Sequence, residues 1–120
     1  MAHLGTTAAG RAVIAPAIAR RMVEPQVQLD SSNVTHRVDM ALGWFREVPL
    51  ASSLATPLLW HYGNVDGHTA AVFLKPAEGL GVIVLQNLGG EMAGVATEQM
   101  GRWLMQRAAA EVARCPPAPR

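Results

Sequence analysis

Two histidines, a tyrosine and an aspartate gather in the stretch WHYGNVDGH, which begins at Trp60. His61, Asp66 and His68 carry donor atoms that ligate metals, and the two histidines flank a predicted turn. No Cys or Glu completes a ligand set there, and the spacing matches no established metal motif. The spacing therefore favours polar residues beside a turn, and we expect neither a metal nor another cofactor.

A serine nucleophile would be the second kind of chemistry, because serine and histidine together carry out acyl transfer. The four serines are Ser31, Ser32, Ser52 and Ser53, all in predicted loops. None lies in a G-x-S-x-G elbow, and none is followed by Lys three residues later. The sequence therefore contains no recognisable activated nucleophile.

The elements that would position these residues begin with a helix that opens at Pro16 and is stopped by Pro25. Residues 26–40 are polar and predict a loop. A short strand is expected at Ala41–Phe45, and a second loop is expected over Val48–Pro57.

Three more strands are expected in succession, at Leu58–Gly63, His68–Pro76 and Gly81–Asn87. Turns at Asn64–Gly67 and Ala77–Leu80 separate them and predict antiparallel hairpins. The last strand contains the run VIVL, which lacks polar alternation and predicts a central strand buried on both faces.

A long helix is predicted from Glu91 to about Arg114. Gly94 and Gly101 are seven residues apart and share one face of it. Each costs about 1 kcal/mol relative to alanine, which a close approach to the sheet would offset. The apolar residues that recur at helical spacing, and predict the packed face, are Met92, Val95, Ala96, Met100, Trp103, Leu104 and Val112.

The expected fold class is α+β, an antiparallel sheet of about four strands with the long C-terminal helix packed across one face.

The composition is 50% hydrophobic and 16% charged, which is ordinary for a globular domain. A formal net charge of +1 gives no indication of a nucleic-acid partner. No apolar run approaches the ~20 residues of a membrane span, and no signal-peptide pattern opens the chain. The sequence leaves the localisation open.

The stretch from Trp60 to Asn87 also resembles the C-terminal core of the serine β-lactamase-like hydrolases. This superfamily contains class C β-lactamases, D-Ala-D-Ala carboxypeptidases and related esterases. Its members carry K-T-G, or H-x-G in many esterase-like members, on a strand that lines the active site. A Gly-containing turn, a strand ending in Pro, an acidic-and-Gly turn and a strand ending in Asn follow.

This chain has the same parts in the same order: His61-Tyr62-Gly63, then Gly67, AVFLKP, AEGLG and VIVLQN. The resemblance covers nearly the whole chain and is strongest over residues 58–104. It implies a partial β-lactamase-like fold. It also implies acyl transfer on a β-lactam, a D-amino-acid peptide or an ester in the complete enzyme.

The resemblance assigns roles to four consecutive residues. His61 replaces the usual lysine and would hydrogen-bond the base or a substrate carboxylate. Gly63 would let substrate lie against the backbone of the substrate-binding strand, and the backbone N–H of Asn64 would donate to the oxyanion hole. Tyr62 would point away from the side of His61 and pack.

The chain departs from the superfamily because it lacks S-x-x-K and a separate Y-x-N. Tyr62-Gly63-Asn64 spells Y-x-N, but its strand-to-turn setting assigns it to H-x-G. The missing motifs would precede Met1 in a full-length relative, and such relatives are often exported. We therefore expect a C-terminal portion that is inactive alone and takes a small-molecule or peptide substrate only when completed. A truncated gene, a split protein and a non-catalytic remnant all remain open.

A non-enzymatic α+β binding or structural module is the alternative function. It explains the hydrophobic periodicity equally well. It does not explain the ordered succession of H-x-G, hairpin and strand-terminal Asn.

Overall fold

The computed structural model describes residues 7, 9–30, 35–51 and 56–114. The four serines lie outside these residues. The chain forms two compact units. Unit 1 comprises Met1–His61 with Leu74–Gly79, and unit 2 comprises Tyr62–Phe73 with Leu80–Arg120.

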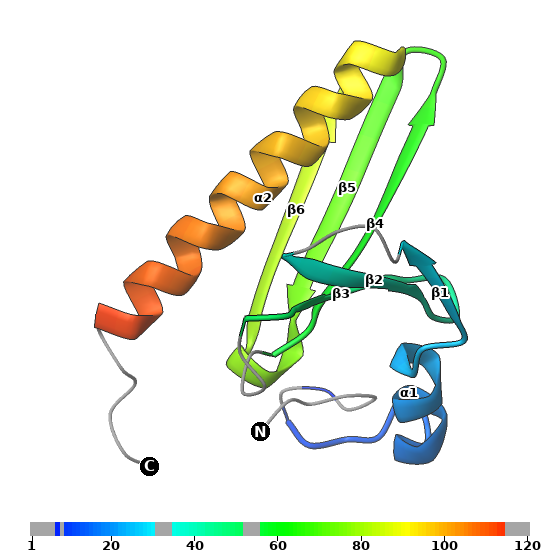
Figure 1. The fold of residues 1–120 in the computed structure, drawn as a ribbon, viewed down its shortest axis with the longest axis vertical. Coiled ribbons are helices and arrows are strands. Elements are labelled where there is room, and N and C mark those ends of the chain that lie inside the picture. Colours follow the sequence, from blue (N-terminus) through cyan, green and yellow to red (C-terminus); the bar gives the residue numbers. More distant parts are fainter. Residues whose placement is uncertain (1–6, 8, 31–34, 52–55, 115–120) are drawn as a thin grey trace. The chain divides into compact units, whose positions relative to one another are not determined.

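The fold is α+β, as predicted, and its sheet has six strands in the order β1-β2-β3-β4-β5-β6 (Figure 1). The expectation of about four strands was therefore too low. The elements are α1 (Pro16–Val23), β1 (Val27–Asp30), β2 (His36–Met40), β3 (Phe45–Pro49), β4 (Leu58–Val65), β5 (His68–Lys75), the 3₁₀ helix η1 (Pro76–Glu78), β6 (Leu80–Gln86) and α2 (Glu91–Arg114). Within the described residues, no helix has the length and apolarity needed to cross a lipid bilayer.

The two extra strands are β1 and β2, in the segment 26–40 that its polarity predicted to be a loop. β2 pairs with β3 in antiparallel register from His36↔Pro49 to Met40↔Phe45. Each strand is short and has only two apolar residues, Val27 and Leu29 in β1 and Val38 and Met40 in β2, so the apolar alternation is too brief to distinguish a strand from a loop. The strand expected at Ala41–Phe45 was displaced, because β3 begins only at Phe45.

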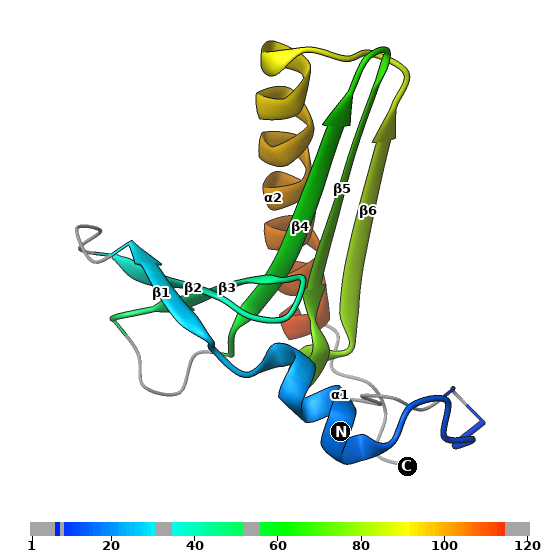
Figure 2. The ribbon, with the colours of Figure 1, turned by 90° about the vertical axis from the view of Figure 1, so that its right-hand side faces the viewer.

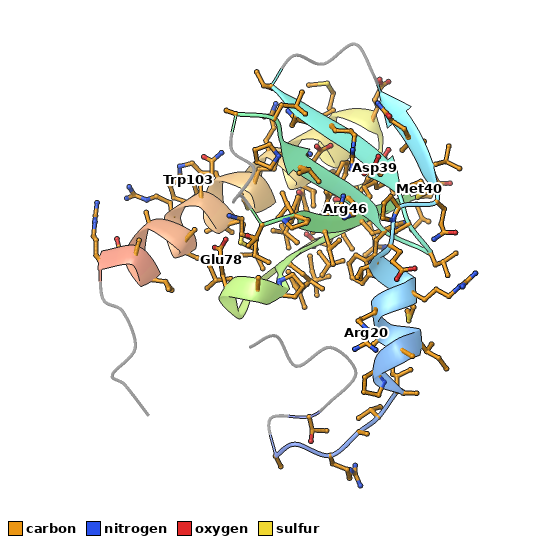
Figure 3. All side chains as sticks on the ribbon, turned by 60° about the horizontal axis from the view of Figure 1, so that its bottom comes forward. Arg20, Asp39, Met40, Arg46, Glu78 and Trp103 are labelled. Carbon is orange, nitrogen blue, oxygen red and sulfur yellow. The ribbon has the colours of Figure 1, made fainter. Side chains whose placement is uncertain are left out.

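The centre of unit 1 combines a buried charge with aromatic packing. Asp39 is 2% exposed, and its Oδ2 lies 3.1 Å from Arg37 Nε and 3.1 Å from Arg46 Nη1. Figure 3 shows Asp39 and Arg46 on the adjacent strands β2 and β3. On the neighbouring pair of strands, the ring of Phe45 stacks on that of Trp60 with centroids 4.5 Å apart.

The strands that the sequence predicted at β4, β5 and β6 are confirmed, with small shifts at their ends. β4 continues to Val65, so only Asp66 and Gly67 form the turn, and Gly67 takes a φ of +81° that favours glycine. The prediction that β6 is central and buried on both faces was wrong. β6 ends the strand order, and only Val84 on it is buried.

The bounds of α2 confirm the predicted helix, but its packed face differs from the prediction. Its buried residues are Ala93, Gly94, Thr97, Gly101 and Met105. The large apolar residues expected to pack are instead exposed: Met92, Val95, Met100, Trp103 and Val112. The expected close approach at the glycines is present, since a side chain at Gly101 would overlap the ring of the fully buried Phe73.

A hydroxyl network joins the same face of α2 to β5 and β6. The Thr69 and Thr97 hydroxyl oxygens lie 2.7 Å apart, and the hydroxyl oxygen of Thr97 is also 2.9 Å from Gln86 Oε1 and 2.8 Å from the carbonyl oxygen of Ala93. Both threonines are buried, so these bonds satisfy polar groups that have left water. They fix the position of α2 along the two strands.

We predict that Gly101→Ala lowers the free energy of unfolding of the chain by about 1–3 kcal/mol, because its methyl group overpacks the Phe73 ring. This loss should outweigh the gain of about 1 kcal/mol in helix propensity. Urea unfolding followed by circular dichroism measures it. Gly94→Ala is the matched control with a smaller loss, since its methyl would meet only the side-chain end of Asn64. Equal stability of both variants would contradict the close approach.

Candidate functional site

The hydrogen bonds of unit 2 show which face of its strands is open. Thr69 on β5 and Gln86 on β6 bond to Thr97 of α2, and Asn64 on β4 bonds to Gly90 just before α2. Successive side chains of a strand point to opposite faces. Gly63, Val65, His68, Ala70 and Leu85 therefore project away from α2, onto a face that no described helix of unit 2 covers (Figure 2).

This open face is hollowed. The hollow has a volume of about 580 Å³ and is lined by Gly63, Val65, His68, Thr69, Ala70, Leu85, Gln86 and Asn87. That volume is within the range of small-ligand sites, which are mostly apolar with a few polar groups. Val65 and Leu85 supply apolar wall, and the polar side chains on this face are those of His68 and Asn87.

Gly63 lies in the wall of the hollow, where the resemblance placed a substrate-binding residue. No heavy atom lies within 4 Å of the position that a Cβ on Gly63 would occupy. Its backbone carries no positive φ that would require glycine. The strand conformation therefore permits a side chain here, and the effect of glycine is to leave the backbone open to the hollow.

His61 is two residues before Gly63 and, by strand alternation, on the same side of β4. Its side chain is exposed, and its ring lies 5.9 Å from that of Phe45 within unit 1. Tyr62 points to the other side of the strand and is 42% exposed, so it is only partly packed.

The side chain of Asn64 has a structural role that the sequence did not indicate. Its Nδ2 donates to the carbonyl oxygen of Gly90 at 2.9 Å, and its Oδ1 accepts from the Gly90 N–H at 3.2 Å. The amide thus pairs with both backbone groups of the residue before α2. The backbone N–H of Asn64, to which the resemblance gives the oxyanion role, is a separate group.

The metal interpretation of His61, Asp66 and His68 gains no support. Among the described residues, no group of three or more His, Cys, Asp and Glu side chains is placed to hold a metal ion. His68 instead lines the hollow.

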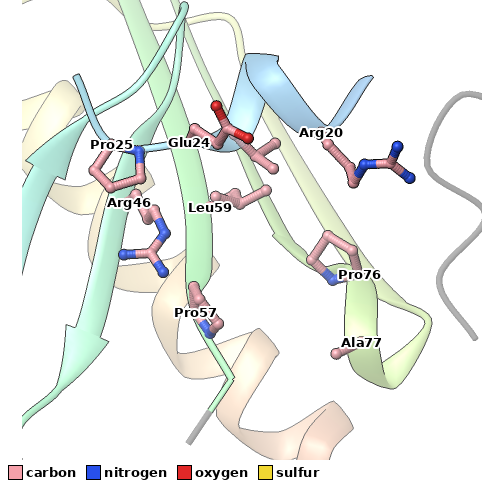
Figure 4. A pocket seen from close by; sticks show the side chains of 9 residues that line it. Arg20, Glu24, Pro25, Arg46, Pro57, Leu59, Pro76 and Ala77 are labelled. Atoms are coloured by element: carbon pink, nitrogen blue, oxygen red, sulfur yellow. The ribbon is translucent and has the colours of Figure 1, made fainter. Parts of the chain in front are cut away.

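A second cavity of about 390 Å³ lies in unit 1 (Figure 4). Leu59 and three prolines form much of its wall, and Arg20, Glu24 and Arg46 border it.

The 3₁₀ helix η1 lies at the edge of this cavity and is held by Glu78. The Glu78 carboxylate accepts hydrogen bonds from Thr56 at 2.6 Å and from Lys75 at 3.1 Å. Partial burial works to raise the pKa of Glu78, but these two hydrogen bonds and the Lys75 charge outweigh it and leave that pKa lowered. Arg46 is already paired with Asp39.

The sequence singled out Gly63 from the H-x-G motif and His68 as a metal candidate on the side of His61, but it missed Asn87 as a residue of the hollow. The turn was predicted two residues too wide, as Asn64–Gly67 instead of Asp66–Gly67.

No protein-family model, curated protein or solved structure matches this chain.

We predict that Asn64→Ala lowers the free energy of unfolding by about 1–3 kcal/mol, because two hydrogen bonds to Gly90 are lost. Amide hydrogen exchange at Gly90 should accelerate in the same variant. Asn64→Asp is the control that keeps the acceptor for the Gly90 N–H and loses the donor, so its exchange should stay slower than that of the alanine variant. Unchanged exchange in Asn64→Ala would refute the pairing.

Proposed function

We propose that the chain is the C-terminal part of a β-lactamase-like serine hydrolase and supplies one wall of its acyl-transfer site. The observation that carries this proposal is that Gly63, of the H-x-G motif, opens its backbone to a hollow on the uncovered face of β4–β6. The ordered motifs that continue through β5 and β6 support it, as does the long helix that follows.

His61 would supply a hydrogen-bonding group beside the reacting centre. Its side chain is exposed, so a substrate can reach it. Histidine is an effective proton carrier near neutral pH. The Asn64 N–H would serve as the oxyanion donor, and a donor of this kind contributes about 3 kcal/mol to the barrier.

The nucleophile and general base would come from a polypeptide that carries S-x-x-K and Y-x-N. Sequencing the coding DNA in frame before Met1 is the direct test of whether both motifs are present. The alternative, a binding module without catalysis, is also consistent with a mostly apolar hollow. It predicts neither motif.

The first assay uses the 120-residue chain alone. We expect no turnover of a chromogenic β-lactam or a short-chain aryl ester above background, since the sequence has no activated serine. Intact-mass spectrometry should show no acyl adduct. Rapid acylation of any of the four serines would overturn the assignment.

The second assay uses the chain joined to the part that carries the nucleophile. We predict that Gly63→Val lowers kcat/KM at least tenfold, because its side chain enters the hollow without meeting another atom of the fold. Unfolding by urea should be nearly unchanged in this variant.

His61→Ala should also lower kcat, whereas His36→Ala on β2 is the control that should leave kcat unchanged. Full activity of both Gly63→Val and His61→Ala would show that neither residue contributes to the acyl-transfer site, and would contradict the proposal.

A further inference from the structure

The cavity of unit 1 is built on a row of residues that crosses three strands. Asp39 of β2 lies opposite Arg46 of β3, and Arg46 lies opposite Leu59 of β4. Directly opposite residues of neighbouring strands project to the same face of a sheet. The Arg46 side chain therefore stands between a buried carboxylate and the apolar Leu59, which is 3% exposed and forms part of the cavity wall.

The guanidinium of Arg46 has donors left for a ligand. The Arg46 side chain is 19% exposed and bonds Asp39 through Nη1. Within the described residues, Nε and Nη2 of Arg46 have no hydrogen-bond acceptor. Donors that are largely removed from water favour an acceptor. Because Asp39 and Leu59 lie on opposite sides of Arg46, an acceptor in the cavity above Leu59 can reach these donors without displacing Asp39.

The rest of the wall offers apolar contact and few other donors. Pro25, Pro57 and Pro76 all line the cavity. A proline has no backbone N–H, so these three positions contribute apolar surface without a donor. Figure 4 shows the Arg46 side chain between those of Pro25 and Pro57. The cavity is therefore an apolar chamber with one oriented cation in its wall.

The charges around the cavity leave one positive charge in excess at this cation. Asp39 is shared by Arg37 and Arg46, so two guanidiniums face one carboxylate. Arg20 and Glu24 also border the cavity, but they are exposed, opposite in charge and four residues apart on α1. In Figure 4 the Arg20 guanidinium extends away from the other side chains. Arg46 is therefore the cation that a ligand in the cavity would meet.

We propose that this cavity binds a small apolar carboxylic acid, with Arg46 on the carboxylate and with Leu59 and the three prolines on the apolar body. A guanidinium donates two parallel hydrogen bonds to a carboxylate. One excess positive charge matches a carboxylate better than a phosphate monoester, which carries about −1.5 to −2. Asp39 holds the guanidinium in place before the ligand arrives, which lowers the entropic cost of binding. The volume of about 390 Å³ is within the range of small-ligand sites.

Octanoate is a suitable probe, because it joins a carboxylate to an apolar chain. A ligand of roughly ten non-hydrogen atoms and ordinary ligand efficiency should bind with a dissociation constant of about 1 mM. In an NMR titration of the 120-residue chain, octanoate should shift the amide signals of Leu59 and Ala77 and leave those of Val65 and Leu85, in the hollow of unit 2, unchanged.

The control ligand is 1-octanol, which has the same apolar chain without the charge and should bind more weakly by about tenfold or more. Equal binding of octanol and octanoate would overturn the proposal. So would octanoate shifts centred on the hollow, or the absence of saturable octanoate binding.

Two arginine variants separate ligand binding from the support of Asp39. Arg46→Gln should weaken octanoate binding by about tenfold or more and leave octanol binding unchanged. Arg37→Gln is the matched control, because Arg37 also bonds Asp39 but does not line the cavity, so its octanoate affinity should be unchanged. Equal weakening by both variants would show an indirect effect through Asp39 and overturn the proposal.

Ala77→Phe tests the same cavity without touching the charged residues. Ala77 is exposed and lines the cavity from η1, so a phenyl ring there can occupy the cavity without entering the core. This variant should lose saturable octanoate binding while its circular dichroism is unchanged, and it decides the outcome if Arg46→Gln does not fold. Unchanged octanoate affinity in Ala77→Phe would place the ligand elsewhere and overturn the proposal. None of these measurements needs turnover, so the result is independent of the proposed hydrolase.

Discussion

The close approach of α2 to β5 is the constraint on which the rest of unit 2 depends. It is possible only because Gly101 leaves room for the ring of Phe73, which is fully buried beneath it. At that separation the hydroxyls of Thr69 and Thr97 come within 2.7 Å, and Thr97 also reaches Gln86 of β6. One small residue thus allows both the apolar packing and the polar network that hold the helix on the strands.

The same constraint explains which helix predictions succeeded. The ends of α2 follow from local signals, namely the glycines before Glu91 and the unbroken helical spacing that follows. The glycine pair also predicted a close approach correctly. The packed face was wrong because we gave it to the largest apolar residues, such as Met100 and Trp103. A closely packed helix buries its small residues, and the large ones are left on its flanks.

The strands show a similar division between local and non-local information. β4, β5 and the turn at Gly67 could be predicted because apolar runs and turn residues mark them locally. β1 and β2 could not, because each is short, with only two apolar residues, and is fixed by backbone pairing and by the bonds of Asp39 to Arg37 and Arg46. In the candidate site, Gly63 was found from its motif. The bonds of Asn64 to Gly90 depend on residues 26 positions apart, which no local pattern encodes.

β6 carries part of the hollow and ends the strand order of the sheet. Its run VIVL has the composition of a strand buried on both faces, yet only Val84 is buried. Leu85 lines the hollow on the open face, and no strand among the described residues pairs with the outer edge of β6. A run of apolar residues therefore predicts a strand, but it does not predict how many faces of that strand are covered.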